Sequence, residues 1–369
     1  MFKITAKDRY ARCGQLDLAH GMVETPVFMP VGTQGTVKAI SVDTLKKIGF
    51  NIILGNTYHL YLRPGTEILY KFGGLNNFMK WDRPILTDSG GFQIMSLSKL
   101  MKIEEGGVRF QSHIDGKEFY LSPDISMKVQ DSIGSDIHMV LDQCIEFDKG
   151  MSNIREAMNL SLKWAEMSKK CFVKKKGRML FGIVQGGTDQ HLREQSAIKT
   201  IDIGFDGYAI GGLAVGEGHE LMLKTLDFTI PNLPDERPRY LMGVGTPEDL
   251  VESVKRGVDM FDCVMPTRAG RHGLAYTKFG TINLRNAKFS DDMMPVDEES
   301  DCPIASVYSR SYLHHLIKSK EILAAMLISE INLHYYNSLM IDLRFAIREN
   351  RLDLKIQEIK KNWRSVDVL

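Results

Sequence analysis

The sequence has few of the features that mark secreted or membrane proteins. Its five cysteines are scattered and odd in number, which indicates a reducing compartment and argues against a disulfide framework. Residues 1–10 alternate charged and apolar side chains and lack the apolar core of a signal peptide. No uninterrupted apolar run is long enough to cross a bilayer. These absences predict a soluble, cytoplasmic protein.

The chain also lacks an excess of charge of either sign. Its 47 basic and 46 acidic residues leave a net charge of +1, so binding to nucleic acid would require a local basic patch. There is no sequence repeat beyond strand–helix units and no low-complexity tract. With 43% hydrophobic and 25% charged residues, the 369-residue chain has the composition of an ordinary globular enzyme with a large core.

What is present is a series of short apolar runs, each apolar on both faces as in parallel strands covered by helices. Helical patterns lie between them, such as the stripe of Ile154, Met158, Leu162 and Ala165. Strands that alternate with helices in this number predict a (β/α)8 TIM barrel. The expected strands are residues 25–32, 51–56, 85–91, 138–142, 180–186, 207–212, 240–245 and 260–265.

Polar or glycine residues follow these runs at the end where a barrel of this kind builds its active site. They are Asn56, Asp88, Asp142, Gln185, Gly212 and Asp262. Asp262 lies inside an apolar strand that Pro266 is expected to break before a loop with two arginines. A buried aspartate is costly unless it is paired, hydrogen-bonded or reacting, so it is either a structural cap of the next turn or a functional group.

Four segments fall outside the plain repeat. Residues 2–19 resemble a strand pair that covers the bottom or side of the barrel. Residues 108–121 alternate in period two around Asp-Gly, which predicts a β-hairpin insertion. Residues 273–286 suggest a second hairpin. Residues 287–369 predict a C-terminal helical subdomain packed on the barrel, so residues 1–369 are expected to form a single domain.

Five motifs together resemble the bacterial tRNA-guanine transglycosylase, of the queuine tRNA-ribosyltransferase family. They occur in family order and the similarity runs from about Thr25 to Arg351. The motifs are residues 56–60, 87–93, 211–217, 240–245 and 259–273. The resemblance implies a (β/α)8 barrel, usually a homodimer, that exchanges the wobble guanine of tRNA for a 7-deazaguanine in queuosine biosynthesis. No redox cofactor is implied.

By this resemblance Asp262 is the nucleophile and Asp88 the general acid/base, while Asn56 and Gln93 hold Asp88 in the empty site. The chemistry requires two carboxyl groups. A carboxylate can trap the ribose carbon that becomes oxocarbenium-like as the glycosidic bond breaks. A second carboxyl group must give a proton to the leaving base and take one from the entering base.

The resemblance also implies a pocket that reads the purine edge. Asp142 would accept from the ring N1–H and the amine, Gln185 and the Gly212 N–H would donate to the carbonyl, and Phe92 would stack on the ring. Taken alone, Phe92 is more often a core residue and Gln185 a strand-end hydrogen bonder. The full expected set is Ser89, Gly90, Gly91, Phe92, Asp142, Cys144, Gln185, Gly212, Leu213 and Val215.

Eukaryotic relatives carry a glycine at the position of Val215. The valine therefore favours the small base 7-aminomethyl-7-deazaguanine over the bulkier queuine.

Contact with tRNA is expected around the nucleophile, where guanidinium groups suit phosphates and base edges. His272 and Leu274 depart from the family pattern of Asn and Gln. A second basic run, Lys169 to Arg178, is either a solvated face or a further RNA contact. The residues expected to contact RNA are Gly243, Gly245, Thr267, Arg268, Ala269, Gly270 and Arg271.

The family's structural zinc is expected to be absent from this chain. Its ligand positions correspond to Ser300, Cys302, Ala305 and Ile331, and only Cys302 is a ligand type. Apolar packing of Ile331 near Ile304 and Ala305 is expected to take over the stabilising role. His314, His315 and His334 lie nearby but at none of the family positions.

Two other functions are compatible with parts of the sequence. A glycoside hydrolase could use the pair Asp88 and Asp262, but it would not explain Asp142, Gln185 and Gly212 as readers of a purine edge. A non-catalytic tRNA-binding paralogue would be expected to lack the nucleophile, whereas Asp262 is present.

Overall fold

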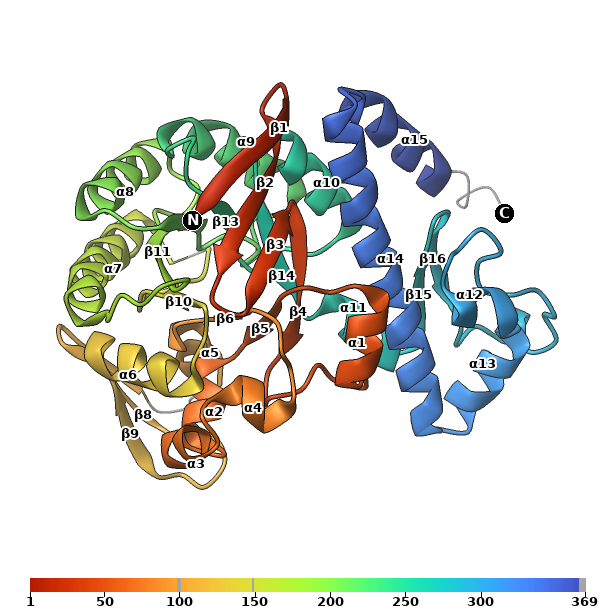
Figure 1. Ribbon diagram of the computed structural model, residues 1–369, viewed down its shortest axis with the longest axis horizontal. Helices are drawn as coiled ribbons and strands as arrows, with labels where there is room; N and C mark the ends of the chain where they lie inside the picture. The colour runs from red at the N-terminus through yellow and green to blue at the C-terminus, as the bar shows by residue number, and fades with distance from the viewer. Residues whose placement is uncertain (98–100, 148, 365–369) are drawn as a thin grey trace.

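A computed structural model describes residues 1–97, 101–147 and 149–364 of the protein, and a closed barrel forms its centre (Figure 1). In this part of the chain eight parallel strands pair in chain order, and β14 closes the barrel against β4, with Asp262 opposite Met29. The strands are β4 (Val27–Gly32), β5 (Ile53–Gly55), β6 (Ile85–Thr87), β10 (Ile137–Met139), β11 (Met179–Val184), β12 (Gly207–Ile210), β13 (Arg239–Leu241) and β14 (Met260–Cys263). The predicted (β/α)8 barrel is confirmed.

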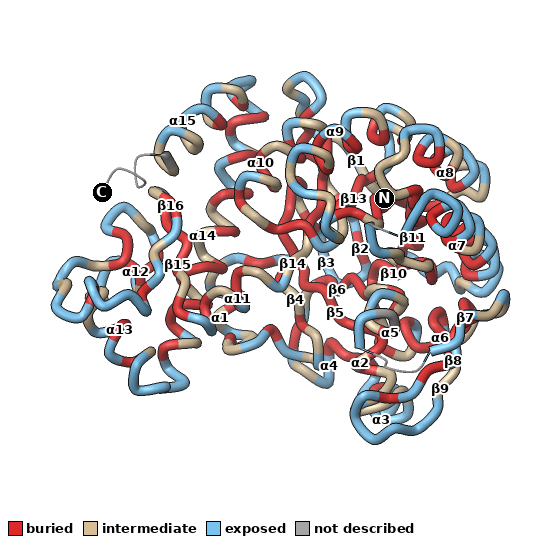
Figure 2. The backbone as a smooth tube through the Cα atoms, turned by 180° about the vertical axis from the view of Figure 1, so that it is seen from behind, coloured by how far each residue is buried: buried red, intermediate tan, exposed pale blue. Residues whose placement is uncertain are grey.

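The strands are buried because helices cover them on the outside and side chains fill the inside, as the buried centre of Figure 2 shows. The predicted stripe Ile154, Met158, Leu162 and Ala165 is buried on α7. The barrel helices, with the short helices between them, are α1 (Val42–Ile48), α2 (Thr57–Leu62), α3 (Thr66–Lys71), α4 (Leu75–Met79), α5 (Gly91–Leu97), α6 (Pro123–Ile133), α7 (Met151–Cys171), α8 (Gln190–Ile203), α9 (His219–Thr229), the 3-10 turn η1 (Ile230–Asn232), α10 (Pro247–Lys255) and α11 (Met265–Arg271).

The segment after Asp262 differs from the prediction. It was expected to be a loop broken by Pro266, but the strand ends at Cys263 and α11 begins at Met265. Proline fits there because its missing N–H and fixed φ suit the first turn of a helix. Gly270 lets α11 approach α14 closely, since a Cβ atom at Gly270 would lie 2.6 Å from the backbone nitrogen of Ser329. Tertiary packing therefore stabilises a helix that its sequence alone did not indicate.

The N-terminal segment covers the end of the barrel opposite to the predicted site. The expected strand pair is a three-stranded antiparallel sheet of β1 (Phe2–Asp8), β2 (Ala11–Leu18) and β3 (Gly21–Thr25). It is tied to the N-terminal ends of the barrel strands by bonds such as Ala19 N to Gly177 O, 2.9 Å, and His20 N to Asp136 Oδ1, 2.9 Å. The third strand was not predicted.

A buried ion pair joins this sheet to β14, the strand that carries Asp262. Arg12 binds Asp259 through Nε–Oδ1 at 2.9 Å and Nη2–Oδ2 at 2.5 Å, and the two residues are 1% and 0% exposed. Burial raises the pKa of Asp259, and the Arg12 guanidinium opposes that rise. Asp259 stands directly before β14, so this pair fixes the start of the strand whose end carries Asp262.

We expect Arg12→Met to lower the free energy of unfolding by about 3–5 kcal/mol, because it leaves the Asp259 carboxylate buried without its cation. Urea denaturation measures the loss. Lys7→Met is the matched control, since Lys7 pairs with the exposed Asp235 at 3.4 Å and such a surface pair contributes below about 1 kcal/mol. Equal losses in the two variants would contradict the assignment.

Two further small sheets lie outside the barrel. The insertion predicted at 108–121 is present as β8 (Gly107–Gln111) and β9 (Glu118–Leu121), but β7 (Met101–Glu104) adds a third strand that was not predicted. The hairpin predicted at 273–286 is β15 (Leu274–Thr277) and β16 (Gly280–Asn283).

The C-terminal helices lie against the barrel on one side. The elements are the 3-10 turn η2 (Ala287–Phe289), α12 (Pro303–Val307), α13 (Arg310–Lys318), α14 (Ile322–Arg348) and α15 (Leu352–Arg364), and residues 365–369 of the expected subdomain lie outside the described residues. Helix α14 contacts α11, β15, β1, β2 and β4. Its second half, from Leu333 to Ile347, belongs to the barrel core, while Leu327, Ile328 and Ile331 pack in a separate C-terminal core. Among the described helices none is both long and apolar enough to span a membrane.

Candidate active site

A cavity of about 440 Å³ opens at the C-terminal ends of the barrel strands. Asp88 and Asp262 both line it, together with most of the residues that the sequence singled out. The predicted residues at its wall are Asn56, Asp88, Ser89, Gly90, Phe92, Gln93, Asp142, Cys144, Gln185, Gly212, Leu213, Val215, Gly243, Asp262 and Arg268. The arrangement follows from parallel strands that all end at one rim.

Asp262 is held at the end of β14 by two donors that share one carboxylate oxygen. The Tyr240 hydroxyl donates to Oδ1 at 2.5 Å, and the Gly243 N–H donates to the same atom at 2.8 Å. In the described part of the chain no hydrogen bond is found to Oδ2, which leaves that oxygen available to attack a bound carbon. Burial raises the pKa of Asp262, while the bonds from Tyr240 and Gly243 favour the ionised form.

Asp88 directly follows β6 and is held by residues that follow the neighbouring strand β5. Asn56 Nδ2 donates to Oδ2 at 2.6 Å, and the Thr57 N–H donates to Oδ1 at 2.8 Å. The pKa of Asp88 is raised to about 7, mainly by burial and in part by charge repulsion from Asp262, although the hydrogen bonds from Thr57 and Gln93 act to lower it. A carboxyl group with a pKa near neutrality can both give and take a proton, as a general acid/base must.

A second carboxylate network forms the deeper wall. Asp142 is 7% exposed and accepts from Ser89 Oγ at 3.2 Å and from Gln185 Nε2 at 2.7 Å. Burial raises the pKa of Asp142, and both of these bonds lower it. Asp142 and Gln185 therefore present an acceptor and a donor side by side.

Glycines let the backbone form the rest of this wall. Gly212 has φ +65°, a left-handed conformation, and a Cβ atom there would lie 2.4 Å from Gln185 Oε1. A Cβ atom at Gly91 would lie 2.5 Å from the Asp142 carbonyl oxygen, although Gly91 borders a neighbouring groove and not the cavity itself. Both glycines are required where main chains approach closely.

Two apolar residues bound the space for a ligand. Phe92 is 49% exposed at the rim, which departs from the core role that an isolated phenylalanine would more often have. Val215 is half-buried in the loop after β12. Glu217 holds this loop by accepting the N–H groups of Ala214 at 2.5 Å and Val215 at 2.9 Å.

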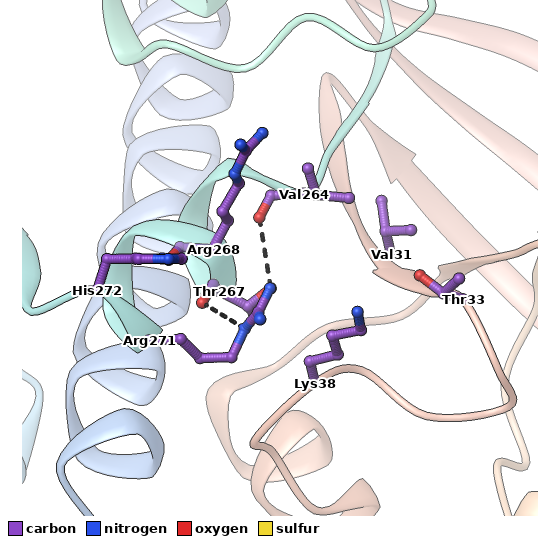
Figure 3. Close-up of a pocket in the computed structure, with 8 residues that line it drawn as sticks. All are labelled: Val31, Thr33, Lys38, Val264, Thr267, Arg268, Arg271 and His272. Carbon is purple, nitrogen blue, oxygen red and sulfur yellow. Dashed lines mark hydrogen bonds between the residues drawn. The ribbon is translucent and has the colours of Figure 1, made fainter. Parts of the chain in front are cut away.

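The predicted RNA-contact residues fall into two groups. Arg268 and Arg271 are exposed on α11 and line a groove of about 260 Å³ beside the cavity, with His272 and Lys38 (Figure 3). Gly243 is exposed as well, and Ala269 is half-buried. By contrast, Gly245, Thr267 and Gly270 are buried, so they are not exposed for contact with RNA and instead shape the loop after β13 and the helix α11.

The second basic run lies at the other end of the barrel. Lys174 pairs with Asp206 at 3.1 Å, and Lys175 and Arg178 both pair with Asp131. Asp206 directly precedes β12, which places these pairs at the N-terminal ends of the strands. The run therefore lies away from the cavity, with much of its charge paired locally.

Sequence reasoning missed four residues that the site uses. They are Thr57, Tyr240, Glu217 and Lys38. A tyrosine within the apolar run 240–245 was a usable signal, because a buried phenol needs a hydrogen-bond partner. Glu217 belongs to the motif 211–217 but was given no role, and no local signal marked Lys38; the roles of both depend on how the loops fold.

Three of the four positions that correspond to the family's zinc ligands pack in the C-terminal core. Cys302, Ala305 and Ile331 are 1%, 0% and 2% exposed, and Ile304 packs against the same cluster. Burial raises the pKa of the Cys302 thiol, which disfavours the thiolate that a metal needs. His314 Nδ1 is bonded to the Leu284 carbonyl at 2.8 Å. This donor set does not fit a structural zinc.

Comparison with known proteins gives one consistent result. A family model described as queuine tRNA-ribosyltransferase matches residues 7–365. A protein of that name from Mesorhizobium japonicum is 54% identical over 367 residues, which cover 100% of this chain and 98% of the relative. One from Rhizobium meliloti is 53% identical with the same coverage, and one from Caldanaerobacter subterraneus is 54% identical over 354 residues, 96% of this chain and 94% of the relative.

Proposed function

This chain belongs to the queuine tRNA-ribosyltransferase family and is a tRNA-guanine transglycosylase, a pentosyltransferase, and we propose that it inserts 7-aminomethyl-7-deazaguanine at the wobble position of GUN-anticodon tRNAs. The observation that carries the reaction is the presence of two differently held carboxyl groups in one cavity. One carboxylate oxygen of Asp262 accepts two hydrogen bonds and the other accepts none from the described residues, whereas Asp88 has a pKa of about 7.

The proposed reaction has two displacements. Oδ2 of Asp262 attacks the ribose C1′ as the bond to guanine breaks, which gives a covalent enzyme–tRNA ester. Guanine leaves with the electron pair of that bond and takes a proton from Asp88. The entering 7-deazaguanine then loses its ring N–H proton to Asp88, attacks C1′ and releases Asp262. Two inversions restore the original configuration of the nucleotide.

Recognition is proposed to divide between the cavity and the groove beside it. Asp142, Gln185 and the Gly212 N–H would read the purine edge, while Phe92 stacks on the ring. Arg268 and Arg271 in the groove would hold the nucleotides on either side of the flipped wobble base. The adjoining positions of cavity and groove support this division, since both are lined by Val264 and Arg268.

Incorporation of labelled guanine into unmodified tRNA tests the function. The glycoside hydrolase alternative predicts no incorporation and would leave the Asp142–Gln185 network without a role. The non-catalytic paralogue alternative predicts tRNA binding without incorporation. The intact hydrogen bonds of Asp262 favour the enzyme.

We expect queuine to be a poorer substrate than 7-aminomethyl-7-deazaguanine by roughly 100-fold in kcat/KM, because the Val215 side chain occupies space that a cyclopentenediol ring needs. Competition between the two bases for tRNA measures the ratio. Val215→Gly should reduce the ratio of the two kcat/KM values by at least about tenfold. Comparable efficiency of the two bases with the unaltered enzyme would refute the role of Val215.

We also propose that the protein folds and exchanges bases without zinc, since the C-terminal core replaces the ligands with apolar contacts. The expected result is no zinc by elemental analysis and an unchanged melting temperature in a chelator. Ile331→His restores one family ligand type inside the apolar core and should destabilise the fold by about 1–3 kcal/mol. One zinc per chain would overturn this proposal.

A homodimer is proposed from the family resemblance. Exposed apolar side chains on the C-terminal helices support it, since Val307, Tyr312 and Met326 are 74%, 38% and 42% exposed. Light scattering gives the mass in solution. Because its substrate is tRNA and its cysteines are free, we propose that the enzyme acts in the cytoplasm.

A further inference from the structure

A fully buried arginine stands behind the base-reading wall. Arg193 lies on α8 and is 0% exposed, and none of the ion pairs among the described residues includes it. Burial lowers its pKa to about 10, and the charge of Glu217 opposes that change. The guanidinium is therefore a permanent cation at neutral pH. A buried cation without a carboxylate in contact is expensive, so its presence calls for a reason.

The partners of Arg193 are backbone carbonyls at the two strand ends that read the base. Nε donates to Gly187 O at 2.6 Å and Nη1 donates to Val184 O at 2.9 Å. Nη2 lies 3.5 Å from Gly212 O. Val184 precedes Gln185, and Gly187 follows it by two residues, so one side chain fixes the positions of both Gln185 and Gly212.

Bracing of this kind does not require charge, as the neighbouring part of the barrel wall shows. Gln130 on α6 is 0% exposed and binds both backbone groups of Met139, donating to its oxygen and accepting from its nitrogen at 2.9 Å each. It also accepts from Thr87 Oγ1 at 2.9 Å. A neutral amide thus ties β6 to β10 beside Asp88 and Asp142. Arg193 holds an equivalent place behind β11 and β12, so its positive charge is a feature beyond what bracing requires.

The charge lies where the reaction needs it. A Cβ atom at Gly212 would lie 3.7 Å from Arg193 Nη2, so the guanidinium directly backs the glycine whose N–H is proposed to meet the base carbonyl. When the bond between C1′ and the base nitrogen breaks, the electron pair goes to the purine and its negative charge spreads to the carbonyl oxygen. A fixed positive charge behind that oxygen stabilises the purine until Asp88 protonates it.

We infer that Arg193 is a positioning residue for base exchange, which aligns Gln185 and Gly212 and stabilises the anionic purine that leaves or enters. The inference rests on the proposed function. It places a cation on the carbonyl side of the base, next to Asp142, which is proposed to accept from the ring N1–H and the amine.

Binding of two free bases tests the role of the charge. Guanine carries the carbonyl, and 2-aminopurine is the same ring without it. Arg193→Gln should weaken the binding of guanine by about 100-fold and the binding of 2-aminopurine by less than about threefold, because only guanine uses the carbonyl contact. Arg193→Lys keeps a positive charge but lacks the planar guanidinium, and it should weaken the binding of guanine by only about tenfold. Gln130→Leu is the structural control and should weaken the binding of guanine and of 2-aminopurine by similar factors.

A pH profile supplies the second readout. Above pH 7 Asp88 is mostly ionised and guanine must leave as an anion, so the cation matters more. The ratio of wild-type to Arg193→Gln rates for formation of the covalent intermediate should therefore rise between pH 6 and about pH 8.5. If the Gln variant does not fold, preserved preference for guanine in Arg193→Lys supports the inference, and loss of that preference opposes it.

The outcomes separate the two proposals. Equal weakening of both bases with a pH-independent rate ratio would show that Arg193 only braces the loops and would overturn the inference. If wild-type protein shows the expected binding pattern but labels no tRNA, the proposed function fails and the assignment of Arg193 to a purine site stands. If wild-type protein binds neither base, both proposals fail.

Discussion

Asp262→Ala is expected to lower the rate of guanine exchange by about 10⁴-fold or more, because among the described residues no other carboxylate is placed to trap the ribose at the end of β14. Asp88 accepts hydrogen bonds from Asn56 and Thr57, which follow the neighbouring strand β5. Exchange is measured with labelled guanine. Wild-type enzyme trapped with tRNA and a 7-deazaguanine should give a slow band on a denaturing gel, and Asp262→Ala should not.

Tyr240→Phe is the matched control for this loss. It removes one of the two donors to Asp262 Oδ1 but keeps the ring and the nucleophile, so the slow band should persist and the rate should fall by only about tenfold. If Asp262→Ala formed the slow band as well as wild type, Asp262 would not be the nucleophile.

Asp88→Asn is expected to lower kcat by about 10²–10⁴-fold, since the amide can neither protonate guanine nor take a proton from the entering base. With a pKa of about 7, the wild-type carboxyl group is protonated below neutrality and ionised above it. Guanine release should therefore slow as pH rises through about 7, and capture of the new base should slow as pH falls through it. Single-turnover rates of the two steps, measured across pH, should lose these opposed dependences in Asp88→Asn.

The same shift predicts a change in stability. The pKa of Asp88 is raised from an ordinary value of 3.8, so the folded state binds this proton more tightly than the unfolded state does. The associated stability is present below pH 3.8 and is lost as pH rises to about 7. Asp88→Asn lacks that loss, so its melting temperature relative to wild type should increase from pH 4 to pH 8. A constant difference would mean that Asp88 is ionised throughout this range.

The architecture was predictable because parallel barrel strands are apolar on both faces and end at a common rim. Runs such as 180–186 therefore revealed a strand, and Gln185 at its end revealed a site residue. The helix α11 was not predictable from its own residues, since Pro266 and Gly270 normally interrupt helices. It forms because Gly270 meets Ser329 on α14, a contact between residues far apart in the chain.

The site was predicted more completely for its buried carboxyl groups than for the residues that hold them. Asp88, Asp142 and Asp262 are costly in their buried positions, and that cost makes them visible in a sequence. Thr57 and Arg193 act through backbone groups, which any sequence supplies, so only the distances between loops reveal them. The strand β7 was missed for a related reason, because its partner β8 determines whether Met101–Glu104 pairs.

The helix α14 belongs to two cores at once, and this has a consequence for the order of events in synthesis. Asn332 donates to the carbonyls of Pro266 and Leu274, and the Tyr336 hydroxyl donates to that of Gly245 at 2.5 Å. The segments on both sides of Asp262 therefore acquire these hydrogen-bond partners from residues that lie 58 to 91 positions later in the chain. A ribosome-bound chain that ends before residue 330 lacks these contacts and part of the barrel core, so we expect base exchange to begin only when translation is nearly complete.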